Sequence, residues 1–363
     1  MDKKIIFISS GLALPRIIKR VKSFTDSGYS VEIYGFDRGM FQDMNTYPES
    51  VVVHHLGELP DGTGYISNFK EHLKKFRHIF KKYKSENIVY YSMGFVPAVL
   101  VSAFGQKPYL YEISDLIYGT FHNNYLKSLF ALIDRKVIKH SVLTILTSQG
   151  FLDYLYPKNP PTNTIIQPNK LNSIFNTLKR KKFLANESIR FGFIGYIRYP
   201  NTIFRFASII GEKFPNYSFD FYGDSKYRDG AIELSKKYPN VHYNGKYKNP
   251  DDLEKIYNSI DIVLACYDTA TFNEQVAEPN KLYESLYFSK PIIVSPGTYL
   301  ANRVEELNCG YVLDATKDIN IMSFLGNLSV KSINEIIERV YNLDKTLMID
   351  DPQGIINRVK ELT

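Results

Sequence analysis

Short apolar runs alternate with amphipathic segments along this chain, and that alternation restricts its fold more than any other feature. Residues 4–9 (KIIFIS) have the composition of a buried strand, and residues 16–27 have the apolar spacing of a helix. Gly28 ends this helix, and the next strand begins at Ser30. Strand, helix and strand in this order form a right-handed βαβ unit, with its two strands parallel in one sheet. The sequence therefore predicts an α/β protein.

A break in this alternation predicts a domain boundary. A Pro- and Asn-rich stretch begins at Tyr156, and a polar run, LKRKKFLANES, follows it before the strands and helices resume. A chain of 363 residues also suits two domains of ordinary size. We therefore expect a first domain over 1–170, a linker over 171–186 and a second domain over 187–345. The remaining segment, 346–363, is expected to form a helix that crosses back to the first domain.

The composition predicts a soluble or peripheral protein of a reducing compartment. Cys266 and Cys309 have neither metal-ligand spacing nor a disulfide pattern, which favours the cytoplasm. The start, MDKKIIFISS, has too short an apolar run for a signal peptide. No uncharged apolar run approaches the roughly 18 residues that span a bilayer. We expect a cytoplasmic location and leave association with the inner face of the cell membrane open.

Positive charge is concentrated in the first half of the chain. The net charge is +7, but residues 1–186 hold 25 Lys and Arg against 14 Asp and Glu. Within this half, residues 68–85 form a dense basic amphipathic helix. One interpretation is a peripheral contact with an anionic membrane, and the other is a helix that covers the sheet with its basic side in water. No nucleic-acid module is recognisable, so nucleic acid is not an expected partner.

A helix with a marked start predicts a phosphate-binding site in the second half. In the run EPNKLYESLYFSKPIIV (278–294), Pro279 suits a first helical turn, Asn280 can cap the free amides, and a buried strand follows. The amino end of a helix attracts phosphate, and Lys281 lies in that first turn. Glu284, one turn further on, can accept two hydrogen bonds from a ribose diol. These residues predict a nucleotide-sugar site; the alternative is a solvated Lys and Glu on an ordinary α/β helix.

The run PNKLYESLYFSKPII resembles the nucleotide-sugar motif of retaining glycosyltransferases of family 4, which have the GT-B fold. The resemblance implies two Rossmann-like domains facing across a cleft, with the donor mainly on the second. In this family the motif ends with a Glu that holds the donor ribose, and Glu284 matches it. A second Glu often stands eight positions earlier, where this chain has Val276. Glu274 or Glu278 could substitute for it, and we take Glu278 as a catalytic candidate.

Three other segments of the second domain resemble donor-binding parts of the family. Gly195 follows the strand at 189–194 and permits close approach of the backbone to a ligand. Arg198, in the same loop, is the expected diphosphate-binding cation and a catalytic candidate; its alternative role is that of an ordinary loop cation. Gly223 ends the next strand and joins the donor-binding set. The resemblance places Tyr247 beside the nucleotide base, and a packed loop aromatic is the alternative.

In the first domain, the strand at 108–113 ends in EISDL. Carboxyl ends of parallel strands face the ligand crevice, so Glu112, Ser114 and Asp115 are placed to meet substrate. Asp115 matches an acid of the family and is taken as catalytic; its alternative role is to cap the following helix. Arg16 lies where the family often has Pro-Arg and is taken as an acceptor-side contact, or as a surface helix residue.

These features predict a glycosyltransferase that moves a sugar from a nucleotide-diphosphate sugar to a hydroxyl of a glycan or lipid-linked acceptor, in cell-surface polysaccharide synthesis. The resemblance implies transfer with retention. We expect no metal, because protein cations would stabilise the leaving diphosphate and the sequence has no DxD-type cluster, and no cofactor beyond the nucleotide-sugar substrate. Two alternatives stay open. One is a non-catalytic nucleotide-sugar-binding or scaffold subunit, which Val276 would favour, and the other is a nucleotide-sugar epimerase.

Overall fold

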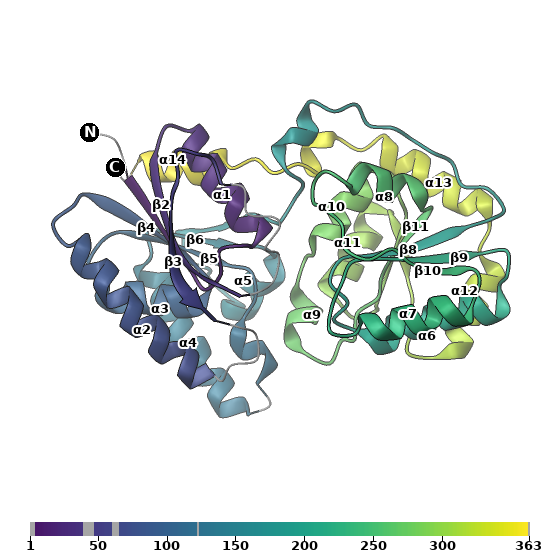
Figure 1. The fold of residues 1–363 in the computed structure, drawn as a ribbon, viewed down its shortest axis with the longest axis horizontal. Coiled ribbons are helices and arrows are strands. Elements are labelled where there is room, and N and C mark those ends of the chain that lie inside the picture. The colour runs from purple at the N-terminus through teal and green to yellow at the C-terminus, as the bar shows by residue number, and fades with distance from the viewer. Residues whose placement is uncertain (1–3, 39–46, 60–64, 122, 362–363) are drawn as a thin grey trace. The chain divides into compact units, whose positions relative to one another are not determined.

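The chain folds into two compact units in the computed structural model, which describes residues 4–38, 47–59, 65–121 and 123–361. The first unit comprises Met1–Pro168 with Asp351–Thr363, and the second comprises Asn169–Asp350. Each unit is a parallel sheet with helices on both faces (Figure 1). Strands covered on both faces must be apolar on both, which explains the nearly continuous apolar runs in the sequence.

The first unit is built, within its described residues, on a seven-stranded sheet of order β3-β2-β1-β4-β5-β6-β7. Every neighbouring pair of these strands is parallel. The order changes direction between β1 and β4, so the carboxyl ends of these two strands mark the topological switch point of this unit. The strands are β1 (Lys4–Ser9), β2 (Ser30–Asp37), β3 (Val52–Glu58), β4 (Ile88–Met93), β5 (Tyr109–Ile113), β6 (Leu143–Leu146) and β7 (Thr164–Ile166).

The helices of the first unit are α1 (Pro15–Asp26), α2 (Tyr65–Lys82), α3 (Phe95–Phe104), α4 (Asn124–His140), α5 (Gln149–Leu155) and α14 (Gln353–Lys360), with a 3-10 turn η2 (Ile117–Thr120). Helices α2, α3 and α4 form one layer in which α3 packs against both neighbours, and α1 and α14 lie on the other side of the sheet (Figure 1). Ile355, Ile356 and Val359 of α14 are buried in one core with Ile17 and Val21 of α1. The C-terminal helix therefore completes the core of the first unit.

The second unit contains, within its fully described range, a six-stranded parallel sheet of order β10-β9-β8-β11-β12-β13. The strands are β8 (Arg190–Ile194), β9 (Ser218–Tyr222), β10 (Val241–Tyr243), β11 (Ile262–Ala265), β12 (Ile292–Val294) and β13 (Gly310–Val312). The helices are α6 (Pro200–Lys213), α7 (Arg228–Lys237), α8 (Leu253–Ser259), α9 (Phe272–Val276), α10 (Asn280–Tyr287), α11 (Tyr299–Leu307), α12 (Asp318–Asn327) and α13 (Val330–Tyr341).

The segment 171–186, expected as a linker, packs on the second unit. Arg180 accounts for this difference, because the five N–H groups of its guanidinium reach six acceptors at 2.8–3.1 Å, with one N–H shared between two of them. Four of the acceptors are carbonyls in the last turns of α10 and α13, where a helix leaves its final carbonyls without partners. A basic run that looks solvent-exposed in the sequence thus joins two helix ends. The second unit begins at Asn169 and not at residue 187.

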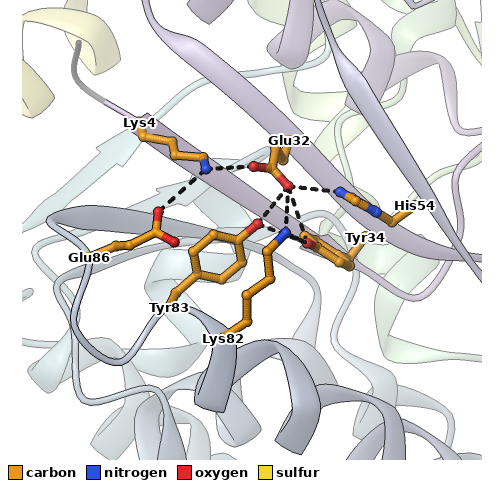
Figure 2. A network of polar contacts seen from close by, with 7 residues as sticks. All are labelled: Lys4, Glu32, Tyr34, His54, Lys82, Tyr83 and Glu86. Carbon is orange, nitrogen blue, oxygen red and sulfur yellow. Dashed lines mark hydrogen bonds and ion pairs between the residues drawn. The ribbon is translucent and has the colours of Figure 1, made fainter.

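A buried carboxylate ties α2 to the amino-terminal edge of the first sheet (Figure 2). Glu32 accepts from Tyr83 Oη at 2.6 Å and Lys82 Nζ at 3.2 Å, and it pairs with a ring nitrogen of His54 at 2.7 Å. Its other oxygen lies 2.6 Å from Lys4 Nζ. Burial opposes ionisation, but these hydrogen bonds outweigh it and hold the pKa of Glu32 well below its usual range. Part of the basic charge of α2 is therefore used to hold the helix on the sheet.

A second buried carboxylate joins α4 to the segment after β5. Asp134 is fully buried and accepts hydrogen bonds from Tyr111 at 2.9 Å and from Tyr118, in η2, at 2.8 Å. Burial raises the pKa of Asp134 to about 6, although both tyrosine hydrogen bonds act in the opposite direction. Folding therefore increases the proton affinity of this carboxyl.

Replacing Asp134 with Asn is expected to reduce the pH dependence of stability. A carboxyl whose pKa is raised by folding stabilises the fold below its ordinary value of 3.8, and this contribution is lost as the pH rises through about 6. Between about pH 5 and pH 7.5 the single group accounts for a loss of about 1 kcal/mol. Urea unfolding of both proteins at the two pH values measures this difference. Equal pH dependence in wild type and Asp134→Asn would contradict it.

Candidate functional site

The candidate site of the second unit lies at the switch point of its sheet. The strand order changes direction between β8 and β11, and ligands of such sheets bind outside the carboxyl ends of the strands at this point. β8 is followed by the loop that carries Gly195 and Arg198, and β11 is followed by Cys266 and Tyr267. The chain then passes through α9 to α10, which carries Lys281 and Glu284.

Glycines at this edge hold the loops after three neighbouring strands together. Gly195 has φ +124° and donates its N–H to the carbonyl of Tyr222 at 2.7 Å. Gly223 has φ +134° and donates to the carbonyl of Gly245 at 2.7 Å. A Cβ added to Gly223 would overlap the carbonyl of Gly195. Gly223 therefore has a structural reason to be glycine, and it supports the loop that contains Gly195.

Gly223→Ala is expected to destabilise the second unit far more than Gly245→Ala. At Gly245, with φ +72°, an added Cβ meets nothing within 4 Å, so only left-handed backbone strain of about 1–2 kcal/mol is expected. At Gly223 the overlap with backbone adds to a similar strain, and a loss of about 4 kcal/mol or more is expected. Chemical unfolding of the two variants measures the difference. Equal losses would show that the Gly195 loop can move away at little cost.

The amine of Lys281 lies beside the Gly195 loop. It would be 3.1 Å from a Cβ placed on Gly195, and it donates to Tyr267 Oη at 3.3 Å. The same amine lies 4.9 Å from the ring centre of Phe193 and 5.5 Å from that of Tyr267. Lys281 is 9% exposed, so its charge is held in a largely enclosed position at the end of β8. The structure thus brings together Gly195 and Lys281, which are far apart in sequence.

Glu284 is held one turn further along α10. It accepts from Tyr257 Oη at 2.7 Å and, through its other oxygen, from the Asn280 side-chain amide at 2.6 Å. Asn280 was expected to be the helix cap, but Pro279 is the cap residue and Asn280 is the first helical residue. Tyr247 packs against the same apolar cluster as Tyr257, and burial together with the charge of Glu284 raises the pKa of Tyr247 well above its usual range. Asn280, Glu284, Tyr247 and Tyr257 therefore form one cluster.

Glu278 does not join this cluster. It is 5% exposed and accepts from Tyr283 Oη at 2.6 Å and Arg303 Nε at 3.2 Å. The residue precedes the Pro279 cap of α10, and its side chain pairs with α11. These contacts argue against a catalytic role for Glu278, because its buried carboxylate already accepts hydrogen bonds from a cation and a phenol.

Glu274 is linked to Lys281 through contacts of Tyr199 and Tyr267. It is half-buried in α9 and accepts from Tyr199 Oη at 2.6 Å and from the Thr271 hydroxyl. The ring of Tyr199 lies 5.0 Å from that of Tyr267, which receives the Lys281 hydrogen bond. Of the two carboxylates that could substitute at the Val276 position, Glu274 is therefore the one connected to the switch point.

Arg198 is exposed in the β8–α6 loop, with its guanidinium carbon 5.9 Å from the ring centre of Tyr196. Its position after β8 places it at the same edge of the sheet as Gly195. Sequence reasoning missed Tyr199, Tyr257 and Tyr267, which organise the site through their hydroxyls. Tyr267 had a usable signal, since it comes directly after the strand IVLA and Cys266.

In the first unit, the candidates at the end of β5 separate into buried and exposed residues. Asp115 is exposed, and the residue that caps η2 is Leu116. Glu112, expected to meet substrate, is fully buried and accepts from Arg16, Arg20 and Tyr91. Burial opposes its ionisation, but the two arginines and the phenol outweigh it and hold the pKa of Glu112 below its usual range.

The assignment of Arg16 to the acceptor side is not supported by its contacts. Arg16 is 8% exposed, its Nε donates to Glu112, and a terminal nitrogen donates to the carbonyl of Gln167 at 3.0 Å. The acceptor-side role stays a prediction, whereas the alternative of a surface helix residue is wrong, because Arg16 is buried. A buried carboxylate at the end of β5 requires a cation, and α1 supplies Arg16 together with Arg20.

Several known proteins are similar to this chain in sequence or in fold. No family model matches the chain. The succinoglycan biosynthesis protein ExoL of Rhizobium meliloti is 22% identical over 359 residues, which cover 93% of this chain and 87% of that protein. The sucrose-phosphate synthase of Thermosynechococcus elongatus superposes with a TM-score of 0.70 at 13% identity, covering 99% of this chain and 98% of that one. Anabaena HepE, solved in complex with UDP and glucose, gives 0.66 at 13% identity, with 99% and 100% covered.

WaaG, a glycosyltransferase involved in lipopolysaccharide biosynthesis, gives a TM-score of 0.62 at 12% identity, covering 95% of this chain and 97% of that one. The chain has the GT-B fold. The prediction of two Rossmann-like domains is thereby confirmed, and at these identities the likeness establishes the GT-B fold alone. Within it, the nucleotide-binding candidates lie in the second unit and Asp115 lies in the first. The described residues include no group of three or more His, Cys, Asp and Glu placed to hold a metal ion.

Proposed function

We propose that this chain is a glycosyltransferase that moves a sugar from a nucleotide-diphosphate sugar to a hydroxyl of a glycan or lipid-linked acceptor, in cell-surface polysaccharide synthesis. The observation that carries the proposal is the enclosed amine of Lys281 beside Gly195 at the switch point, with Glu284 one turn further along α10. The names of similar proteins agree with it. HepE was solved with UDP and glucose, WaaG is a glycosyltransferase, and ExoL serves succinoglycan biosynthesis.

In this proposal the donor diphosphate lies between the Gly195 loop and the amino end of α10. Lys281 and the free N–H groups of the helix would stabilise the negative charge that grows on the leaving diphosphate, and the exposed Arg198 would add to it. Glu284 would accept the ribose hydroxyls with the lone pairs that Tyr257 and Asn280 leave unused. Tyr247 would lie near the base. These cations supply the charge stabilisation that supports transfer without a metal ion.

The sugar itself would be held by Glu274, whose half-buried carboxylate is linked through Tyr199 and Tyr267 to Lys281. Asp115, at the carboxyl end of β5, would act on the acceptor side or near the donor sugar. We further propose that transfer retains the anomeric configuration. An acceptor attacking from the face of the departing diphosphate could give its proton to a phosphate oxygen, so no nucleophilic side chain is required.

The location of the protein belongs to the same proposal. No helix in the described part of the chain combines the length and apolar character needed to cross a bilayer. A cytoplasmic protein that associates with the inner face of the cell membrane would reach both a nucleotide-sugar donor and a lipid-linked acceptor. The exposed lysines of α2 support a contact with anionic lipid.

Acceptor-dependent turnover tests this function. Purified protein with a nucleotide sugar that binds it should release the nucleoside diphosphate and glycosylate an acceptor, with the anomeric proton of the product showing retention by NMR. Asp115→Asn should lower turnover without changing donor affinity. Donor binding with no transfer to any glycan or lipid-linked acceptor would favour a non-catalytic subunit. Conversion of the nucleotide sugar without an acceptor would favour an epimerase.

A further inference from the structure

The first half of α4 leaves large apolar side chains in water. Its exposed members, with their exposed fractions, are Tyr125 (89%), Leu126 (47%), Leu129 (50%) and Leu132 (59%). Tyr125, Leu129 and Leu132 are spaced by four and three residues, which places them on one face of the helix. The opposite face already supplies the buried residues Ala131, Asp134, Val137 and Ile138. Packing on the sheet therefore does not account for the outer apolar face.

The outer face of α4 becomes basic toward its C-terminal end. Lys136 and Lys139 are exposed there, and Asp134, the acidic residue of this helix, is buried. Helix α2 lies in the same layer, with α3 between it and α4 (Figure 1). Its exposed cations are Lys70, Lys74, Arg77, Lys81 and Lys82, of which Lys82 also contacts Glu32. The layer thus combines an apolar patch with a broad positive surface.

We propose that this layer docks on an anionic lipid bilayer, with the apolar face of α4 inserted among the headgroups and the cations of α2 and α4 on lipid phosphates. Amphipathic helices bind membranes in this way, by adding apolar burial to attraction for anionic lipid. A contiguous exposed apolar patch on a soluble protein marks an interaction site. The surrounding positive charge selects an anionic surface over a second copy of this chain, whose own α2 and α4 would present like charges.

The position of α4 in the chain determines which edge of the first sheet faces the lipid surface. α4 follows β5 and η2, so its amino end lies toward the carboxyl edge of the first sheet, where Asp115 is exposed. The apolar residues belong to that end of the helix. Docking therefore brings the acceptor-side edge of the first unit toward the lipid surface. The identification of this edge with a lipid-linked acceptor rests on the proposed function, whereas the binding to lipid does not.

Vesicle sedimentation of the full chain tests the docking. Wild-type protein should bind phosphatidylcholine vesicles that contain phosphatidylglycerol and bind much less to phosphatidylcholine alone, with binding that weakens as salt is raised. The double variant Leu129→Ser with Leu132→Ser should bind on the order of 10-fold more weakly. The matched control is Ile319→Ser, at a 65% exposed position of α12 in the second unit, and it should bind like wild type.

A charge variant provides a second test of the docking if the leucine variant folds poorly. Lys136→Gln with Lys139→Gln should weaken binding and reduce its salt dependence while leaving the apolar face intact. Wild-type protein that does not bind anionic vesicles would overturn the proposal. So would a self-associating wild type whose leucine variant is monomeric, because a second copy would then be the occupant. Nucleotide binding, measured without lipid, reports separately on the proposed transferase function.

Discussion

Lys281→Met is expected to weaken nucleoside diphosphate binding about 10- to 100-fold, since a hydrogen bond to a charged group contributes about 1.5–3 kcal/mol. Methionine keeps an unbranched apolar stem against Phe193 and Tyr267 and removes the positive charge. The 9% exposure of Lys281 is the reason to expect a large effect, because an enclosed cation is poorly screened by solvent. Calorimetric titration of wild type and variant with the same nucleotide measures the change.

The matched control for this prediction is Lys236→Met. Lys236 is exposed in the last turn of α7, and that helix end lies away from the carboxyl edge of the sheet. Its replacement should leave nucleotide affinity within about twofold, because exposed charges contribute little. Equal affinities of wild type and Lys281→Met would remove Lys281 from the diphosphate site. Equal losses in Lys281→Met and Lys236→Met would indicate a general effect of net charge.

Glu112→Ala is expected to lower the stability of the first unit by about 3–5 kcal/mol, the range for breaking a buried ion pair by removal of one partner. Arg16 and Arg20, which are both buried, would then lose the carboxylate that they share. The pKa of Glu112 is held below its usual range, so its contribution is present above the ordinary value of 4.5 and is lost as the pH falls through the lowered folded value. Urea unfolding followed by circular dichroism measures the loss.

Asp115→Asn provides the contrast, because Asp115 lies only three residues from Glu112 but is exposed. We expect it to change stability by less than about 0.5 kcal/mol and to lower transfer activity. The pair of variants separates a residue that holds the fold from one that is placed to meet substrate. A stable Glu112→Ala protein would show that Arg16 and Arg20 find water or other partners, and that the buried cluster does not hold the first unit together.

Local patterns in the sequence were sufficient for much of the fold. The strand β1 was predicted to its end residues, because a short apolar run bounded by charged and small polar residues suits a buried strand. Helix α1 was predicted over 16–27 and lies at Pro15–Asp26, one residue away at each end. The start of α10 was recognisable because Pro279 cannot continue a preceding helix.

Long-range contacts explain what the sequence could not show. Arg16, Glu112 and Arg180 all have charged side chains in sequence contexts that suggest exposure, and each is paired across a long sequence separation. The sequence showed that Glu278 was close to the motif, but only the structure shows that Arg303 of α11 occupies it. In the same way, the tyrosines that position Glu284 and Lys281 come from α8 and from the segment after β11. The spacing of residues along the chain does not identify such partners.

Binding of a nucleoside diphosphate at the switch point of the second unit can be measured with a calorimetric panel of UDP, GDP, ADP and their common sugars. Wild-type protein should bind one nucleotide family. Glu284→Ala should lose that binding while remaining folded, and Glu233→Ala, at an exposed position of α7, should keep it. Binding that survives in Glu284→Ala, or wild-type protein that binds none of the nucleotides, would contradict a donor site at this switch point.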